Sequence, residues 1–156
     1  MRIALGSDHR GVSCAGQLAD RLRGQGHDVS LFAPTTGESC DYPVPAYQVA
    51  SMVSGKSADR GVLICGTGIG MSIAANKVPG ARAAVVHDEL TAQLSRTHND
   101  ANIICLSGDL LGQRLIEKVV EIFLASDFEG GRHARRVARI AAIERGEDPA
   151  SLESSS

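Results

Sequence analysis

The sequence has very few aromatic residues: among 156 residues there is no Trp, with two Tyr and three Phe. It also has no marked excess of charge, because 16 basic and 18 acidic residues give a formal net charge of -2. Proteins that bind nucleic acid neutralise phosphates with clustered Lys and Arg, and often stack bases on aromatic rings. The composition therefore indicates no nucleic-acid partner.

Long apolar runs and closely spaced cysteines are missing as well. No stretch is apolar over the length that a membrane-spanning helix needs, and no apolar leader follows Met1. The four cysteines, Cys14, Cys40, Cys65 and Cys105, form no Cys-x-x-Cys pair, so they indicate neither a zinc site nor a redox dithiol. We expect a cytoplasmic protein with reduced thiols, no membrane association and no bound metal.

The sequence does contain a regular alternation of two kinds of segment. Short apolar segments rich in β-branched residues alternate with longer amphipathic ones, which is typical of βα units in a parallel sheet. This pattern predicts strands over 2–7, 27–32, 61–65, 81–86 and 103–107, and helices over 12–23, 45–54, 69–75, 89–97, 111–125 and 132–145.

These elements predict one α/β domain over residues 1–146. We expect a doubly wound five-stranded parallel sheet of order 2-1-3-4-5. Helices on both faces would make it a Rossmann-like or flavodoxin-like three-layer sandwich, with an extra C-terminal helix. Residues 147–156, which end in Glu-Ser-Ser-Ser, are expected to form a disordered tail.

Ligands of such sheets bind at the carboxyl edge where the strand order reverses, here between the first and third strands. The flanking segments are Ser7-Asp8-His9-Arg10-Gly11 and Cys65-Gly66-Thr67-Gly68-Ile69-Gly70. The glycines of the second segment follow a strand and open a helix, so backbone N–H groups can face an anionic oxygen. A plain βα turn would use the same residues, and a dinucleotide fingerprint would need its third glycine where Met71 stands.

Free cysteine is often only a small buried hydrophobic residue. Cys65, however, ends a predicted strand just before a helix N-terminus, which favours the reactive thiolate form. His98 and Asn99, and likewise Asp8 and His9, would each serve equally well as parts of helix caps. Their expected convergence with Cys65 near one crevice favours a proton-transfer site.

The last predicted helix presents arginines on one face, since Arg132, Arg136 and Arg139 align at about 100° per residue. Such a row is usually a solvated surface. Because it follows Gly130-Gly131, we expect the helix over 132–145 to span a dimer interface and to offer guanidinium groups to a phosphate.

Several further segments complete a recognisable pattern. Its carriers are Gly6-Ser7-Asp8-His9, Asp41-Tyr42-Pro43, the run from Ile64 to Gly70, Ala74-Ala75-Asn76-Lys77, the run from Leu94 to Asp100, and Glu129-Gly130-Gly131-Arg132-His133. In this order they resemble the ribose-5-phosphate isomerase B family, which also contains the galactose-6-phosphate isomerase subunits. The similarity extends from Met1 to about Arg145.

The resemblance implies an aldose-ketose isomerase that works through a cis-enediolate without a metal or other cofactor. Cys65 would be the base that moves the proton between two carbons, and His98 would assist ring opening together with Asp8. The anion hole would consist of the backbone amides of Gly66, Thr67, Gly68, Ile69 and Gly70 with the Thr67 hydroxyl. The other substrate contacts would come from His9, Tyr42, Asn99, Arg132 and Arg136, the arginines across a dimer interface.

One segment departs from the family pattern. A basic residue normally follows the fifth strand and contacts the phosphate, whereas this chain has Ser107-Gly108-Asp109, and an acid there would repel a phosphate dianion.

The resemblance therefore implies a homodimer or tetramer that interconverts ribose 5-phosphate and ribulose 5-phosphate. It leaves open another phosphosugar, namely erythrulose 4-phosphate, allose 6-phosphate or galactose 6-phosphate. A non-catalytic nucleotide-binding module is the alternative from a different class, but such a module has no use for Cys65 and His98.

Overall fold

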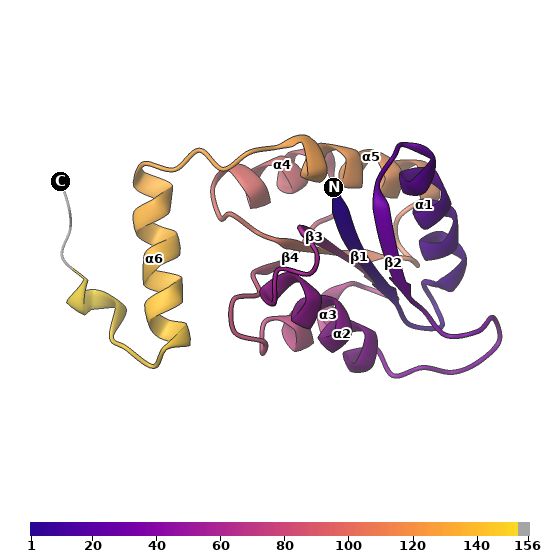
Figure 1. Cartoon of the computed structure of the whole chain (residues 1–156), viewed down its shortest axis with the longest axis horizontal. Coiled ribbons are helices and arrows are strands. Elements are labelled where there is room, and N and C mark those ends of the chain that lie inside the picture. Colours follow the sequence, from indigo (N-terminus) through magenta and orange to yellow (C-terminus); the bar gives the residue numbers. More distant parts are fainter. Residues whose placement is uncertain (153–156) are drawn as a thin grey trace.

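A sheet of five parallel strands forms the centre of the structure, a computed structural model that describes residues 1–152 (Figure 1). The strands are β1 (Arg2–Ser7), β2 (Asp28–Phe32), β3 (Arg60–Cys65), β4 (Ala83–Val85) and β5 (Ile103–Ser107). The residues of β1, β3 and β5 are almost all buried, because helices cover both faces of the sheet.

Helices form one layer on each side of this sheet (Figure 1). One layer contains α1 (Val12–Gly24), α4 (Glu89–Thr97) and α5 (Gln113–Ala125), and the other contains α2 (Pro43–Ser54) and α3 (Ile69–Ala75). The observed ends of strands and helices lie within two residues of the predicted ones. The three-layer α/β sandwich is confirmed.

The predicted order of the last two strands is wrong. The sheet has the order β2-β1-β3-β5-β4, so β5 lies beside β3 and β4 lies at the edge. All five residues of β5 are buried, whereas the three of β4 are only partly buried. A strand that is mainly apolar and buried on both faces gains most from a central place, and a very short strand limits unwanted pairing at an edge.

The reversal of strand order still falls between β1 and β3, as predicted. Side chains alternate along β3, so Val62 and Ile64 pack toward α1, α4 and α5, while Leu63 and Cys65 pack toward α2 and α3. The Cys65 side chain therefore leaves the strand on the α2–α3 side.

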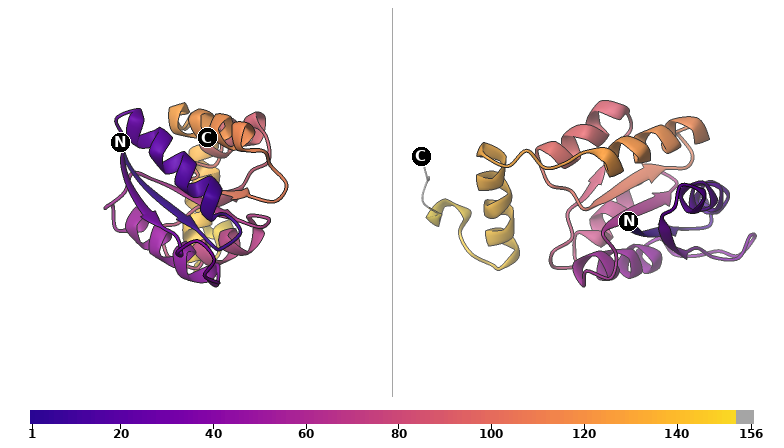
Figure 2. Two further views of the ribbon diagram at one scale, coloured as in Figure 1. Left: turned by 90° about the vertical axis from the view of Figure 1, so that its right-hand side faces the viewer. Right: turned by 45° about the horizontal axis from the view of Figure 1, so that its top comes forward.

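The C-terminal helix α6 (Arg132–Glu144) stands away from both helical layers, beyond the amino-terminal ends of the strands (Figures 1 and 2). We call this end of the sheet its amino edge and the opposite end its carboxyl edge. Part of the segment expected to be disordered is ordered: Pro149–Ser151 forms a turn of 3₁₀ helix, and the Asp148 side chain accepts the N–H of Ala150 at 2.9 Å. Residues 153–156 of that predicted tail lie outside the described residues. Within residues 1–152, no helix is both long and apolar enough to cross a bilayer.

Candidate active site

Asp8 lies where the ends of β1 and β3 meet. Its backbone N–H donates to the carbonyl of Ile64 at 3.3 Å, which ties the residue to β3. Its Oδ1 accepts the N–H groups of Arg10 at 2.9 Å and Gly11 at 3.2 Å, so the carboxylate shapes the turn into α1. The Asp8 residue is only 5% exposed, and these bonds hold it at the switch point.

Cys65 is the last residue of β3, and its thiol receives a hydrogen bond from the turn that follows. The N–H of Gly68 donates to the Sγ atom at 3.1 Å, and the Thr67 hydroxyl accepts the N–H of Ile69 at 3.3 Å. Gly68 has φ +78°, and a Cβ there would lie 3.1 Å from the backbone of Cys105. Only glycine satisfies both conditions, so the turn directs a backbone N–H at the sulfur.

The loop before α2 closes the same region. Nδ1 of His9 lies 3.2 Å from the carbonyl oxygen of Cys40, and the Tyr42 ring packs against Gly70, where an added Cβ would lie 2.7 Å from two ring atoms. The structure thus gathers one set of predicted residues at the carboxyl edge of the sheet. We call them the carboxyl-edge group: Asp8, His9, Tyr42, Cys65, Gly66, Thr67, Gly68, Ile69 and Gly70.

Strand β5 brings Asp109 to this edge. Ser107 pairs with Cys65, and the N–H of Asp109 donates to the carbonyl of Gly66 at 3.3 Å. The Oδ2 atom of Asp109 lies 2.7 Å from both Nε and Nη2 of Arg10, and this contact raises the pKa of the Arg10 guanidinium. The expectation of an acid that simply repels phosphate is therefore corrected, because a guanidinium neutralises the carboxylate.

The other predicted residues lie at the opposite edge of the sheet. His98 follows α4, which runs back toward the start of the strands, and the chain then enters β5, where Ile103 pairs with Gly61. From Gly61 to Cys65, β3 advances about 13 Å at ~3.3 Å per residue. The prediction that His98 and Cys65 of one chain face the same crevice is therefore wrong, because a helix that follows a parallel strand returns its end to the amino edge.

At the amino edge, His98 is held by contacts with residues at and before α6. Its ring stacks on His133, with centroids 4.1 Å apart and an interplanar angle of 7°. Oε2 of Glu129 lies 3.9 Å from Nε2 of His98 and 3.8 Å from Nε2 of His133. Burial, together with the neighbouring side chains of His98 and Arg132, lowers the pKa of His133. We call this set the amino-edge group: His98, Asn99, Glu129, Arg132, His133 and Arg136.

Three members of the amino-edge group are candidate metal ligands. The ligand atoms of His98, Glu129 and His133 all lie within 4.8 Å of one another. An imidazole binds a metal along the nitrogen lone pair in its ring plane, whereas these two planes are nearly parallel, so their lone pairs do not converge on one point. The geometry fits a stacked histidine pair that shares a carboxylate better than it fits a metal centre.

The remaining thiols are poor candidates for a base. Burial raises the pKa of Cys14 to about 11 and raises that of Cys105 still further. Burial and the nearby Asp41 also raise the pKa of Cys40. All three thiols stay protonated at neutral pH, in agreement with the prediction that they serve packing or loops.

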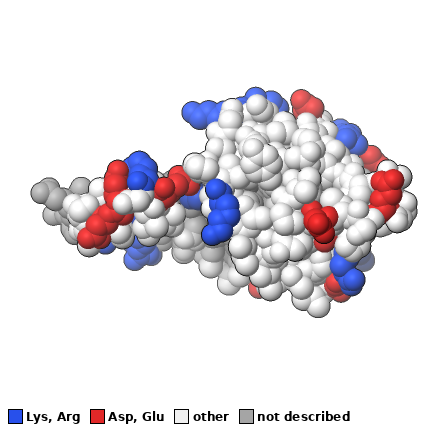
Figure 3. All heavy atoms as spheres, turned by 90° about the horizontal axis from the view of Figure 1, so that it is seen from below, with Lys and Arg blue, Asp and Glu red and all other residues white. Residues whose placement is uncertain are grey.

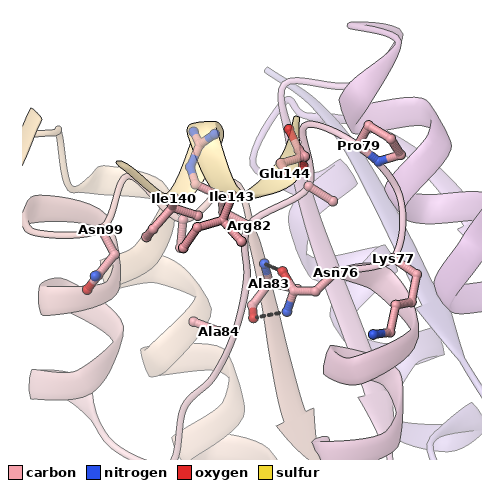
Figure 4. Close-up of a pocket in the computed structure, with 12 residues that line it drawn as sticks. Asn76, Lys77, Pro79, Arg82, Ala83, Ala84, Asn99, Ile140, Ile143 and Glu144 are labelled. Atoms are coloured by element: carbon pink, nitrogen blue, oxygen red, sulfur yellow. Dashed lines mark hydrogen bonds between the residues drawn. The ribbon is translucent and has the colours of Figure 1, made fainter. Parts of the chain in front are cut away.

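A cavity of about 620 Å³ lies between α6 and the segment from α3 to β4 (Figure 4). Ile140 and Ile143 of α6 line it, and Asn99 lies at its edge. Glu144 accepts the N–H of Gly80 at 2.7 Å and so ties α6 to the sandwich. The walls are mainly apolar, so this cavity is poorly suited to a sugar phosphate.

A smaller cavity of about 300 Å³ adjoins the carboxyl-edge group, between the ends of β1 and β2 and the start of α2. The Ser7 hydroxyl lines it and, within residues 1–152, is buried without a hydrogen-bond partner. Cys40, which contacts His9, lies in its wall. The wall of this smaller cavity therefore contains a hydroxyl without a partner, one residue before Asp8 of the carboxyl-edge group.

Comparison with known proteins shows the family to which the chain belongs. Residues 3–140 match the family model described as Ribose/Galactose Isomerase. The chain belongs to this family. Ribose-5-phosphate isomerase B of Escherichia coli K12 is 43% identical over 143 residues, which cover 92% of this chain and 96% of that protein. D-erythrulose-4-phosphate isomerase of Pectobacterium atrosepticum is 38% identical, over 92% of this chain and 95% of that protein.

Solved structures of the ribose/galactose isomerase family show the same fold. Ribose-5-phosphate isomerase B of Clostridium thermocellum superimposes with a TM-score of 0.92 and 46% identity, over 94% of this chain and 99% of that chain. Arg10, Glu129 and His133 had no predicted role at the site. Arg10 adjoins His9, which was a signal, but its partner Asp109 lies 99 residues away, so the ion pair was not visible in the sequence.

Proposed function

We propose that this chain is an aldose-ketose isomerase that interconverts ribose 5-phosphate and ribulose 5-phosphate. The observation that carries the proposal is the setting of Cys65: a thiol at the end of β3, with the N–H of Gly68 3.1 Å from its sulfur. Membership of the isomerase family supports the reaction class. The relatives named for ribose 5-phosphate support the substrate.

In the proposed reaction the Cys65 thiolate removes the proton from C2 of the open aldose. The electron pair moves toward the carbonyl oxygen at C1, which gives a cis-enediolate. A proton then passes from the hydroxyl oxygen at C2 to the oxygen at C1, and the Cys65 thiol returns its proton to C1, which yields the ketose with its carbonyl at C2. Backbone N–H groups of Gly66 through Gly70, with the Thr67 hydroxyl, would stabilise the enediolate oxygen. One well-placed donor of this kind is typically worth about 3–4 kcal/mol in the transition state.

The ring-opening step needs groups from both edges of the sheet. Asp8 would act from the carboxyl-edge group, while His98 would act from the amino-edge group. Asn99 would hold sugar hydroxyls, and His9, Arg132 and Arg136 would bind the phosphate. Because the two groups lie at opposite edges of one chain, a complete site requires the amino-edge group of a second copy.

The proposed assembly is therefore a homodimer. Two such dimers would form the tetramer. The support for the homodimer is the α2–α3 face, which carries few charged side chains (Figure 3) and exposes Tyr42, Val44, Tyr47, Ile69 and Ile73. This face adjoins the carboxyl-edge group. On α6, Ile140 and Ile143 are 44% and 60% exposed, which suits a helix that reaches over a partner.

The proposed chemistry uses only a base and hydrogen-bond donors, so it calls for no metal or nucleotide. The four free thiols support the expected cytoplasmic setting. A tetrulose phosphate is the alternative substrate, because a 38% identical relative is named for erythrulose 4-phosphate.

A panel of phosphosugars tests the proposal. Ribose 5-phosphate, erythrulose 4-phosphate, allose 6-phosphate and galactose 6-phosphate are each assayed for aldose-ketose interconversion, and we expect the highest kcat/KM with ribose 5-phosphate. A higher value with another sugar would change the substrate but keep the reaction. Binding of a phosphosugar without turnover of any of them would favour a non-catalytic module.

A further inference from the structure

We propose that Arg10 binds the phosphate of the substrate and that Asp109 is the positioning residue that holds its guanidinium over the site. The proposal rests on the proposed function, because it concerns the same phosphosugar site. It assigns a cation to the carboxyl-edge half of the site, close to the thiol.

The ion pair covers the first residue of the glycine turn. Arg10 follows β1 and Asp109 follows β5, so their side chains meet across the end of β3, which lies between these strands. A Cβ on Gly66 would lie 3.0 Å from Oδ2 of Asp109 and 3.2 Å from both Cδ and Nε of Arg10. Gly66 follows Cys65 directly, so the guanidinium is a near neighbour of the proposed base.

The Cys65 thiol and Arg10 lie toward different sides of the sheet, so the reacting carbons of a substrate and its phosphate can lie apart. The Cys65 side chain packs with α2 and α3, whereas Arg10 lies two residues before α1, which belongs to the opposite layer. A substrate with its carbonyl end at the sulfur can therefore extend over the strand end and place its other end near the guanidinium. In a phosphosugar that other end is the phosphate.

The guanidinium has donors left for a ligand. Nε and Nη2 of Arg10 both contact Oδ2 of Asp109, and within residues 1–152 the Nη1 atom makes no hydrogen bond. The Arg10 side chain is 55% exposed. Guanidinium groups bind phosphate through several N–H donors in one plane, and a carboxylate on one edge of that plane fixes where the other edge points.

Structural stabilisation explains this pair poorly. Ion pairs that are as exposed as Arg10 and Asp109 contribute little to folding stability. Arg10 also cancels the negative charge of Asp109, which would otherwise repel a phosphate. Binding of an anion accounts for both the position and the exposure of the guanidinium.

The test measures KM, kcat and the inhibition constant of inorganic phosphate, with ribose 5-phosphate as substrate. We expect Arg10→Met to raise KM and the phosphate inhibition constant about ten-fold or more, because a hydrogen bond to a charged group is lost, and to change kcat much less. The control is Arg2→Met. Arg2 pairs with Asp59 at 2.6 Å and is 51% exposed, but it lies at the start of β1, at the other edge of the sheet.

A charge exchange tests the role of Asp109. Arg10→Asp removes the cation and Asp109→Asn removes the carboxylate that holds it, and we expect each change to raise KM. The double variant Arg10→Asp with Asp109→Arg returns a paired guanidinium to the same place from the other strand, so we expect KM to recover to within about three-fold of wild type. A merely structural ion pair would recover stability in the double variant without this recovery of KM.

The outcomes separate this inference from the proposed function. If the wild type isomerises ribose 5-phosphate and Arg10→Met keeps the wild-type KM and phosphate inhibition, the inference is wrong and the function stands. If the wild type isomerises no sugar in the panel, the proposed function fails, and calorimetry with inorganic phosphate decides the inference. Weaker phosphate binding in Arg10→Met but not in Arg2→Met supports it, and equal binding in both overturns it.

Discussion

Cys65 and Cys105 lie on adjacent strands, yet their surroundings suit them to different tasks. Cys105 is completely buried, and burial raises its pKa, so it remains an inert thiol. Cys65 ends its strand and receives the N–H of Gly68. Cys105 lies in register with Leu63, two residues before the strand end, and is surrounded by packed side chains, whereas Cys65 at the strand end meets the polar backbone of a turn.

Cys65→Ser should reduce kcat by about 10²- to 10⁴-fold while inorganic phosphate still binds, because the hydroxyl keeps the size of the group but is a far poorer base. Cys14→Ser makes the same chemical change in α1, on the other face of the sheet from the Cys65 side chain, and should keep the wild-type kcat. Steady-state kinetics on both variants, with circular dichroism to confirm folding, gives the comparison. A Cys65→Ser enzyme with near-normal turnover would rule out this thiol as the base.

The stacked pair at the amino edge predicts a pH-dependent stability. Burial lowers the folded-state pKa of His133, so below about pH 6.5 the unfolded chain binds a proton that the folded chain does not. The free energy of unfolding should therefore fall as the pH decreases from 7.5 to 5.5. His133→Phe keeps an aromatic ring on His98 but cannot titrate, so urea unfolding should show a weaker pH dependence for this variant.

The exposed residue His87 provides the control for this titration. His87→Asn should leave the pH dependence of the wild type unchanged. Equal pH dependence in wild type and His133→Phe would mean that His133 does not lose a proton on folding.

At the scale of elements, local signals predicted most of the architecture. Apolar periodicity and the glycines after strands mark element ends locally, so the predicted ends agree within two residues. Strand order is not local, because it depends on which strand gains more from burial between its neighbours. The exchange of β4 and β5 could therefore not be predicted from the order of the elements along the chain.

The difference between local and non-local contacts also explains which parts of the site were predicted. The carboxyl-edge group comes from residues that directly follow β1 and β3, so neighbouring strands were enough to bring them together. The pairs Arg10–Asp109 and His98–His133 join segments that are distant in sequence. Their contacts depend on the tertiary structure, and no sequence pattern indicated either pair.

Glycine substitutions should have opposite effects in two elements. Gly68→Ala places a Cβ at φ +78° and 3.1 Å from backbone atoms, so it should lower the free energy of unfolding by about 1–3 kcal/mol and reduce kcat by displacing the N–H from Cys65. Gly16→Ala lies within α1 with open space around its Cβ, and should stabilise the protein by about 0.5–1 kcal/mol. Urea unfolding measures both changes, and a neutral Gly68→Ala would show that the turn tolerates a side chain.

At the scale of the whole molecule, one chain carries the carboxyl-edge group and the amino-edge group, the two halves of the proposed site, at opposite edges of one sheet. The strands keep these halves apart, since β3 runs the full distance between them and is buried along nearly all its length. A change of loop conformation within one chain would therefore not bring His98 to Cys65. In a symmetric pair, each interface patch meets its equivalent on the partner, so one contact between two copies produces two complete sites.

This arrangement predicts complementation between inactive variants. Cys65→Ser disables the carboxyl-edge group and Arg136→Ala disables the amino-edge group, so each homodimer should have very low activity. After unfolding, mixing and refolding, half of the dimers should be mixed, and one of their two sites should combine an intact Cys65 with an intact Arg136. About a quarter of wild-type activity should therefore return, given random pairing of equal amounts.

The matched control mixes Cys65→Ser with Asp8→Asn, whose defects lie in the same carboxyl-edge group. Every site of a mixed dimer then contains one defective carboxyl-edge group, so mixing should restore nothing. Affinity tags of two kinds on the two variants establish that the subunits have exchanged. If exchange is complete and Cys65→Ser with Arg136→Ala stays as inactive as the control, both residues act within one chain or Arg136 lies outside the site. Recovery confined to the first mixture places the thiol and the arginine of each site on different chains, because only then does a mixed dimer contain one undamaged site.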